Sequence, residues 1–196
     1  DRSGVVQGAL EDDFGYDSYA KYVLNGPPIF TIRDNEIIPT EDKKVKEIFD
    51  PNNYAKEELE HLLTMFFPDV RTKKYIEIRM MDSIPYPLNF SAVALIKGIF
   101  YNEDNLEKVY GFIKDISIDD VKESKLKIIE EGLQGKLKDM TILDFGKWLV
   151  EVAKSGLEDE EVKYILPLEE ILNQGKNPYE LVKDKAHLGK RESIQG

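Results

Sequence analysis

The chain contains no cysteine among its 196 residues, and this absence removes several kinds of chemistry at once. Without cysteine there is no disulfide scaffold, no zinc–thiolate site and no cysteine nucleophile. Histidine is scarce too. We expect its two residues, His61 and His187, to have structural or surface roles rather than catalytic ones. The absence of cysteine predicts a cytoplasmic protein.

Long hydrophobic runs are also missing. The longest apolar stretch, Phe90 to Tyr101, is interrupted by Lys97 and is too short to cross a bilayer. The sequence starts at Asp1-Arg2-Ser3-Gly4, with no initiator methionine and no signal peptide. We therefore expect a piece of a longer protein that has no membrane contact.

Positive charge is in deficit, because 27 Lys and Arg residues face 38 Asp and Glu residues, for a formal net charge of -11. Such a surface repels nucleic acid, and the sequence has no basic stripe that could bind it. Any site for a small anion must concentrate Lys, Arg or a metal ion against this overall field. The composition, 41% hydrophobic and 10% aromatic, is that of a globular protein.

Alternating side chains predict three strands, all within the first 80 residues. Ile29 to Arg33 and Glu36 to Ile38 form a hairpin around Asp34-Asn35, and Tyr75 to Met80 is the strongest strand pattern. We expect these strands to belong to one antiparallel sheet. Three strands are few for a sheet, so they are interpreted as the edge of a larger one.

Helices are predicted through most of the remaining sequence. The patterns cover Tyr16 to Leu24, Leu59 to Phe66, Leu106 to Ile113 and the nearly all-apolar Asn89 to Tyr101, which we expect to be buried. Helix starts are indicated by Ser117 with Asp120, Thr141 with Asp144 and Asn177-Pro178 with Glu180. The prediction is an α+β fold in one domain, residues 1–196, with a strand-containing part (1–87) and a helical part (88–196).

Chemistry is concentrated on the third strand. A period of two places Tyr75, Glu77 and Arg79 on one face, and Ile76 and Ile78 on the other, which we expect to pack against helices. A glutamate can bind a hard cation such as Mg²⁺, and an arginine presents a planar fork to phosphate or carboxylate. The competing interpretation is an exposed strand with an ordinary salt bridge.

The residues before this strand favour a functional site. Arg71, Lys73 and Lys74 precede it, so four of the nine residues from Arg71 to Arg79 are basic. In a chain of net charge -11, an anion site needs such a local excess.

These residues also carry a family resemblance. Phe67 to Arg79, FPDVRTKKYIEIR, followed by Asp82, resembles the signature of glutamate–cysteine ligases of the plant and proteobacterial type. Asp1 to Gly4 resembles a stretch midway through that family's sequence, and Tyr19 to Ile32 resembles its helix-then-strand passage. Nearly the whole chain is similar to the later half of the family, which implies the C-terminal fragment of a larger catalytic domain.

The resemblance implies a fold related to glutamine synthetase, in which an antiparallel sheet forms a funnel for ATP, metal and glutamate. It implies that Glu77 is a metal ligand and that Arg79 is catalytic, facing the reacting phosphate and carboxylate. Arg71 and Lys73, with Arg79, are the implied substrate- and phosphate-binding residues. Two departures concern an extra residue at Phe66-Phe67 and the run Ser83 to Tyr86, where the family usually has a Gly-Pro-aromatic sequence.

The implied reaction is the ATP-dependent joining of the γ-carboxylate of L-glutamate to L-cysteine through a γ-glutamyl phosphate, the first step of glutathione synthesis. Mg²⁺ or Mn²⁺ is the implied cofactor, and the missing N-terminal half of the same enzyme is the implied partner. Two alternatives stay open: a related carboxylate–amine ligase with another acceptor, and a non-catalytic helical interaction module. We expect the fragment alone to lack activity and to self-associate through an exposed sheet edge.

Overall fold

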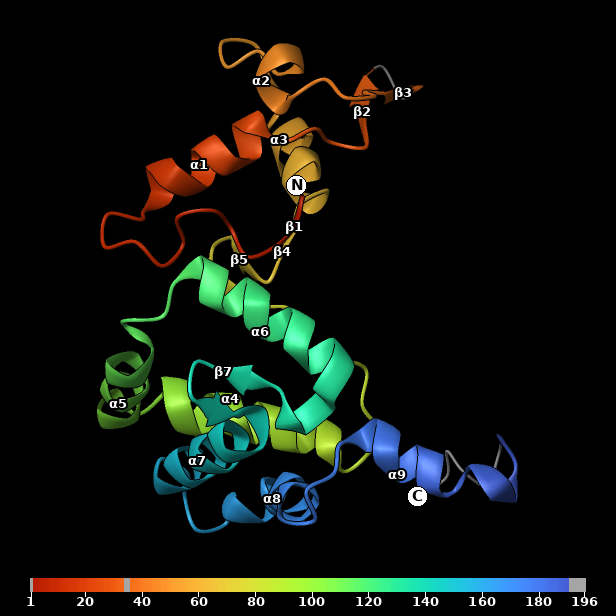
Figure 1. The fold of residues 1–196 in the computed structure, drawn as a ribbon. Coiled ribbons are helices and arrows are strands. Elements are labelled where there is room, and N and C mark those ends of the chain that lie inside the picture. Colours follow the sequence, from red (N-terminus) through yellow and green to blue (C-terminus); the bar gives the residue numbers. More distant parts are fainter. Residues whose placement is uncertain (1, 34–35, 191–196) are drawn as a thin grey trace. The chain divides into compact units, whose positions relative to one another are not determined.

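The computed structural model describes residues 2–33 and 36–190, and these form two compact units (Figure 1). Unit 1 ends at Met81 and unit 2 begins at Asp82. Small two-stranded sheets and helices make up unit 1, and unit 2 is mostly helical. The predicted α+β class, with a mostly helical C-terminal region, is confirmed. Two sequence predictions, the turn at Asp34-Asn35 and the family-like residue Asp1, lie outside the described residues.

Unit 1 begins with a short strand and a ten-residue helix. Its elements are β1 (Ser3–Gly4), α1 (Tyr16–Asn25), β2 (Phe30–Arg33), β3 (Glu36–Pro39), α2 (Val45–Ile48), α3 (Lys56–Thr64), β4 (Phe67–Pro68), β5 (Val70–Thr72) and β6 (Ile76–Ile78). β1 pairs with β4 in parallel, whereas β2 pairs with β3 and β5 with β6 in antiparallel fashion.

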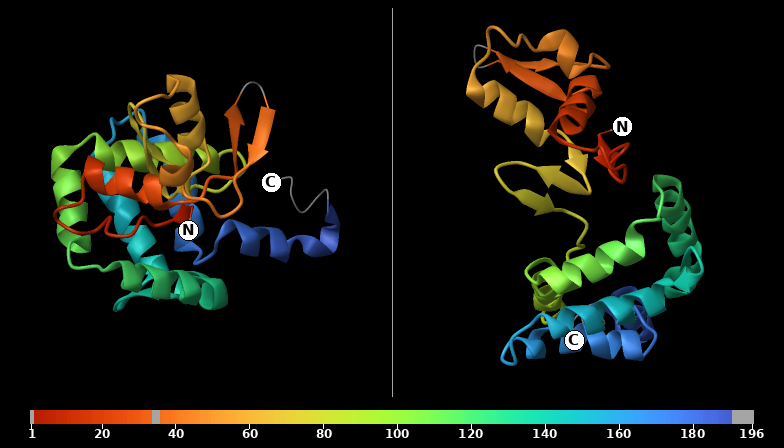
Figure 2. Two further views of the ribbon diagram at one scale, coloured as in Figure 1. Left: turned by 90° about the horizontal axis from the view of Figure 1, so that it is seen from above. Right: turned by 90° about the vertical axis from the view of Figure 1, so that its left-hand side faces the viewer.

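The expectation of one sheet shared by the first hairpin and the strand at 75–80 is wrong. Within the described residues the strands of unit 1 pair only two by two, and the two hairpins are separate in Figure 2. The partner of β6 is β5, which the sequence patterns did not predict as a strand. The two strands pair because they are close in sequence, since a connection of only three residues costs little loop-closure entropy. Within this connection the Lys73 amide donates to the Tyr75 carbonyl at 2.9 Å.

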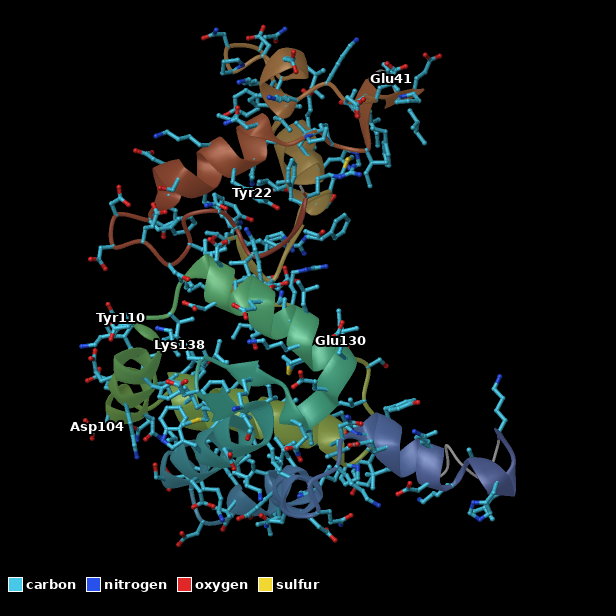
Figure 3. All side chains as sticks on the ribbon, in the orientation of Figure 1. Tyr22, Glu41, Asp104, Tyr110, Glu130 and Lys138 are labelled. Carbon is cyan, nitrogen blue, oxygen red and sulfur yellow. The ribbon has the colours of Figure 1, made fainter. Side chains whose placement is uncertain are left out.

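The core of unit 1 joins α1 and α3. Tyr19 and Val23 of α1 pack with Leu62 of α3 and with Phe66, which is fully buried. Figure 3 shows Tyr22 on the side of α1 that faces α3, where its ring meets that of Phe66 edge-on at 5.6 Å. Gly26 permits this packing, because a Cβ there would lie 2.2 Å from the Phe66 ring.

Unit 2 is built from helices with one small hairpin. Its elements are α4 (Leu88–Phe100), α5 (Glu103–Ile113), α6 (Ile118–Glu131), β7 (Lys136–Leu137), β8 (Met140–Thr141), α7 (Ile142–Ser155), α8 (Leu166–Asn173) and α9 (Pro178–Asp184), with 3₁₀ turns at Gly132–Gln134, Val162–Tyr164 and Ala186–Leu188. The predicted helix starts are confirmed: Ser117, Thr141 and Asn177 each accept a hydrogen bond from the amide three residues on.

Helices α4, α7 and α8 lie side by side and form the core of unit 2 (Figure 1). The expectation that α4 is buried nearly all round is wrong, since Phe90 and Val93 are exposed. Its neighbours α7 and α8 cover only the face that carries Ala94 and Ile99. Phe145 and Trp148 of α7 are half-buried, and the Phe112 ring stacks on the Phe145 ring and lies tilted against Trp148.

Within residues 2–33 and 36–190, no helix combines the length and the apolar character that a membrane crossing requires.

Candidate functional site

The β5–β6 hairpin brings the predicted site residues together. Its register places Arg71 directly opposite Glu77, so their side chains share one face. Arg79 follows the strand, and its amide donates to the Asp69 carbonyl at 2.9 Å, which continues the ladder by one more bond. Arg71 on β5 and Arg79 just after β6 therefore both lie beside the Glu77 carboxylate.

Three cations surround the Glu77 carboxylate. The Arg71 Nε donates to one oxygen at 2.6 Å, and the Lys73 Nζ lies 3.6 Å from the same oxygen. The Arg79 Nη1 lies 3.4 Å from the other oxygen. The Arg71 hydrogen bond, together with the charges of Arg71, Lys73 and Arg79, holds the pKa of the Glu77 carboxyl below its usual range.

The cluster carries a net positive charge, because three cations face one carboxylate. We call Arg71, Lys73, Glu77 and Arg79 the cation cluster. In a chain of net charge -11 this is a local reversal of sign, of the kind that favours a phosphate or carboxylate ligand. The two arginines can bind such groups through planar, paired donors.

Arg71 is the inner member of the cluster. Its side chain is only 8% exposed, whereas those of Lys73, Glu77 and Arg79 are about 30% exposed, at 33%, 29% and 29%. A buried guanidinium requires a partner, and the Glu77 carboxylate is that partner. Lys73 and Arg79 are thus the cations of the cluster that solvent or a ligand can reach.

Tyr19 of α1 approaches the cluster from the side. Burial raises the pKa of its hydroxyl, while the Thr72 backbone and the Arg71 charge act in the opposite direction. The hydroxyl oxygen is buried beside the Thr72 backbone, but it makes no hydrogen bond of standard geometry among the described residues. Sequence reasoning missed this residue, because nothing in the pattern around Tyr19 connects α1 to a hairpin so far along the chain.

The expectation that helices cover Ile76 and Ile78 is wrong for Ile76. Ile76 is 72% exposed and Val70 is 42% exposed, whereas Ile78 is half-buried. Helix α1 approaches the hairpin on the Arg71 side through Tyr19, and α3 faces the turn of the hairpin. Val70 and Ile76 are therefore left as exposed apolar side chains in unit 1.

A cavity of about 540 Å³ lies between α3 and the turn of the hairpin. Its walls are Lys56, Leu59, Glu60, Leu63 and Thr64 of α3, and Thr72, Lys73, Lys74 and Tyr75 of the hairpin. Lys73 belongs both to this wall and to the cation cluster. The cavity and the cluster thus share the Lys73 side chain.

The predicted metal site does not fit the residues of this chain taken alone. No group of three or more His, Asp or Glu side chains suited to a metal occurs among residues 2–33 and 36–190. Glu77 offers one carboxylate, and three cations already compete for it. Hard cations such as Mg²⁺ take about six oxygen ligands, so most of the ligands would have to come from elsewhere.

The two histidines lie outside the cation cluster. The His61 ring packs 5.1 Å from the Phe30 ring, and the His187 Nδ1 lies 3.0 Å from the Asp184 carbonyl oxygen. The His61 Nε2 is buried and has no hydrogen-bond partner among the described residues. The structural or surface role of both histidines stays a prediction.

Fold and cluster together describe an α+β chain with a cation-rich site of the kind that binds phosphate or carboxylate groups. The sequence model of glutamate-cysteine ligase family 2 matches residues 1–195, and the chain belongs to this family. It is 26% identical over 196 residues to a chloroplastic glutamate–cysteine ligase of Solanum lycopersicum, an alignment that covers 95% of this chain and 38% of the relative. A chloroplastic glutamate–cysteine ligase of Arabidopsis thaliana is 25% identical over 190 residues, covering 92% of this chain and 36% of the relative.

The chain therefore spans about two fifths of the length of the curated relatives that it matches. Family membership supports the resemblance carried by Phe67 to Arg79. The activity of those longer relatives, their substrates and their partners are properties of the whole proteins.

Proposed function

We propose that this chain supplies the phosphate- and carboxylate-binding part of an ATP-dependent ligase that joins the γ-carboxylate of L-glutamate to the amine of L-cysteine. The observation that carries the proposal is the convergence of Arg71, Lys73 and Arg79 on one carboxylate, Glu77. Membership of glutamate-cysteine ligase family 2 supports the choice of reaction.

The chemistry of such a ligation demands a site of this charge. Phosphoryl transfer from ATP to the γ-carboxylate brings two anions together, and the acyl phosphate that results is attacked by the amine with release of phosphate. Cations must neutralise the reacting groups and hold them in line. No protein nucleophile is needed, which agrees with the absence of cysteine from the chain.

The residues of the cluster have distinct roles in this proposal. Arg79, at the accessible edge, is the catalytic residue that stabilises charge on the transferring phosphoryl group, and Lys73 binds phosphate beside it. Arg71 is buried and positions Glu77, which in turn keeps the cationic side chains in a fixed arrangement. A bound anion would draw Lys73 and Arg79 toward itself while Arg71 keeps its hydrogen bond to Glu77.

Metal binding by Glu77 stays a prediction, and it requires oxygen ligands from residues beyond this chain. ATP, L-glutamate and L-cysteine are the proposed substrates, and the remaining part of a longer glutamate–cysteine ligase is the proposed partner. The exposed apolar side chains of Val70 and Ile76 on the hairpin offer a suitable surface for that partner.

Substitution of Arg79 by lysine tests the proposal in the natural enzyme that contains these residues. Arg79→Lys keeps the charge but loses the planar fork, so we expect kcat to fall by about 10²–10³-fold. KM for ATP should change less, because the interaction strengthens in the transition state. The assay measures phosphate release that depends on ATP, glutamate and cysteine.

The control for this experiment is Lys108→Arg, an exposed exchange on α5 that should leave kcat unchanged. Replacing cysteine by other amino acids in the same assay separates the proposed enzyme from a ligase with another acceptor. A near-normal kcat for Arg79→Lys would contradict the proposal and leave a structural salt bridge as the better account of the cluster.

A further inference from the structure

Tyr19 is a core residue of unit 1 that carries a hydroxyl group which the core does not need. Its side chain is 8% exposed and belongs to the same hydrophobic core as Val23, Leu62 and Phe66. The ring takes part in this packing, but the buried hydroxyl oxygen makes no hydrogen bond of standard geometry among the described residues. Because a buried hydroxyl without a partner costs stability, a phenylalanine would suit the core better.

The backbone of β5 turns one polar group toward this hydroxyl. The Lys73 amide donates to the Tyr75 carbonyl and the Arg79 amide donates to the Asp69 carbonyl, so every second residue of β5 directs its backbone groups at β6. Thr72 lies between these positions, and the alternation of an antiparallel pair directs its backbone groups away from β6. The hydroxyl of α1 lies beside that backbone.

Thr72 also lies between two members of the cation cluster in the sequence. Arg71 and Lys73 flank it, and both approach the same oxygen of the Glu77 carboxylate, at 2.6 Å and 3.6 Å. The backbone at Thr72 therefore sets the direction of both cationic side chains. A two-stranded hairpin is only marginally stable by itself, and Ile76, which pairs with Thr72, is exposed. A contact from the core of unit 1 would hold this strand in place.

We propose that Tyr19 is a positioning residue for the cation cluster, and that its hydroxyl accepts a hydrogen bond from the Thr72 amide when a phosphate group is bound. This bond fixes the strand between Arg71 and Lys73 and connects the cluster to the core of unit 1. The inference rests on the proposed function and adds to it a residue that acts on the ligand only through β5. Hydrogen bonds of a site that are poorly aligned in the free protein commonly tighten when the ligand binds.

Tyr22 offers a matched control on the same helix. Its hydroxyl is also buried without a hydrogen-bond partner among the described residues, and its ring centre lies 5.8 Å from that of Tyr19. The Tyr22 ring meets Phe66 (Figure 3), and burial together with Tyr19 raises the pKa of the Tyr22 hydroxyl to about 12. Both tyrosines thus place an unpartnered hydroxyl in the same core, and that of Tyr19 is the one beside Thr72.

The experiment compares Tyr19→Phe with Tyr22→Phe, each of which removes one oxygen atom and leaves the ring in place. Isothermal titration calorimetry measures the binding of pyrophosphate to the 196-residue chain. Tyr19→Phe should weaken this binding by about three- to tenfold, the net effect of one hydrogen bond, and Tyr22→Phe should change it by less than about twofold. Without pyrophosphate, neither variant should unfold at a lower urea concentration than the wild type, because each removes a buried group that lacks a partner.

Nuclear magnetic resonance supplies a readout that a packing role would not change. In the wild type, the Thr72 amide proton should move downfield and exchange more slowly when pyrophosphate is added, because it gains a hydrogen bond. The same response should persist in Tyr22→Phe and be lost in Tyr19→Phe.

The outcomes separate this inference from the proposed function. If the two phenylalanine variants bind pyrophosphate equally well, if the Thr72 response persists in Tyr19→Phe, or if Tyr19→Phe destabilises the free chain, the positioning role is overturned and the phosphate-binding role of the cluster survives. If the wild-type chain does not bind pyrophosphate, or if Lys73→Ala and Arg79→Lys leave its binding unchanged, both proposals are overturned.

Discussion

Glu77 lies at the centre of the cation cluster. Its carboxylate is the counter-ion of the buried Arg71 and the meeting point of the more accessible Lys73 and Arg79. Removing it would leave a guanidinium buried without a partner, which costs far more than the loss of an exposed ion pair. The site therefore depends on Glu77 whether or not that residue ever contacts a ligand.

The lowered pKa of Glu77 gives a prediction about pH. Since the surrounding cations hold that pKa below its ordinary value of 4.5, the folded state binds fewer protons than the unfolded state below about that pH. The stability supplied by the carboxylate is complete above pH 4.5 and is lost as the pH falls through the lowered pKa. The difference in free energy of unfolding between the wild type and Glu77→Gln should therefore be largest near neutrality and shrink in acid.

Urea unfolding followed by circular dichroism at a series of pH values measures this difference. Glu107→Gln, an exposed change on α5, is the matched control and should show a small difference that does not vary with pH. A gap for Glu77→Gln that stays constant from neutral to acidic pH would show that the carboxylate is not held by the cluster.

At the scale of elements, the backbones of α4 and α7 approach each other closely at Gly98 and Ala153. A Cβ at Gly98 would lie 2.2 Å from the Ala153 carbonyl oxygen, and one at Gly156 would lie 2.2 Å from the Gly98 carbonyl oxygen. Asn105 of α5 completes the arrangement, since its side-chain amide donates to the Gly98 and Val152 carbonyls, each at 2.8 Å. Small residues and one buried amide thus hold three helices together.

Gly98→Ala tests this packing. The added methyl meets backbone, which cannot move aside as a flexible side chain can, so we expect unit 2 to lose about 2–4 kcal/mol of stability. Gly111→Ala on α5 is the control, because a Cβ there meets nothing within 4 Å, and it should stabilise the helix by about 0.5–1 kcal/mol. The fluorescence of Trp148, the single tryptophan, reports unfolding of α7, and equal effects of the two changes would contradict the packing argument.

The whole molecule consists of two units, each with its own core. Val6, Val23 and Leu62 belong to the core of unit 1, and Val150 and Ile165 to that of unit 2. The cation cluster and the cavity between α3 and the hairpin turn both lie in unit 1. Nothing in the proposed chemistry uses a side chain of unit 2.

This distribution predicts that the 196-residue chain alone has no ligase turnover. One carboxylate among three cations does not make a metal site, and the phosphates need more neutralisation than the cluster can offer without one. Phosphate release from ATP in the presence of glutamate and cysteine measures turnover, with the natural enzyme as the positive control. Robust turnover by the chain alone would show that its own residues complete the site.

Sedimentation of the same sample tests the predicted self-association through exposed strand edges.

The sequence by itself determined the features that depend on near neighbours. Helix starts at Ser117, Thr141 and Asn177 follow from side chains three residues away, and a period of two correctly grouped Glu77 with Arg79. The basic residues before the strand also predicted a positively charged site. These signals are local, because a capping hydrogen bond or a strand face involves only a few consecutive residues.

The tertiary structure alone decided which strand pairs with β6, which face of the hairpin is covered and which helix reaches the cluster. The apolar pattern of Ile76 and Ile78 predicted a covered face, yet Ile76 is exposed and Arg71 on the other face is buried. Tyr19 reaches the site only because α1 packs onto α3 and Phe66. Burial and strand pairing depend on segments that are distant in the chain. The alternation of a short strand predicts that its two faces differ, but it does not predict which face the rest of the protein covers.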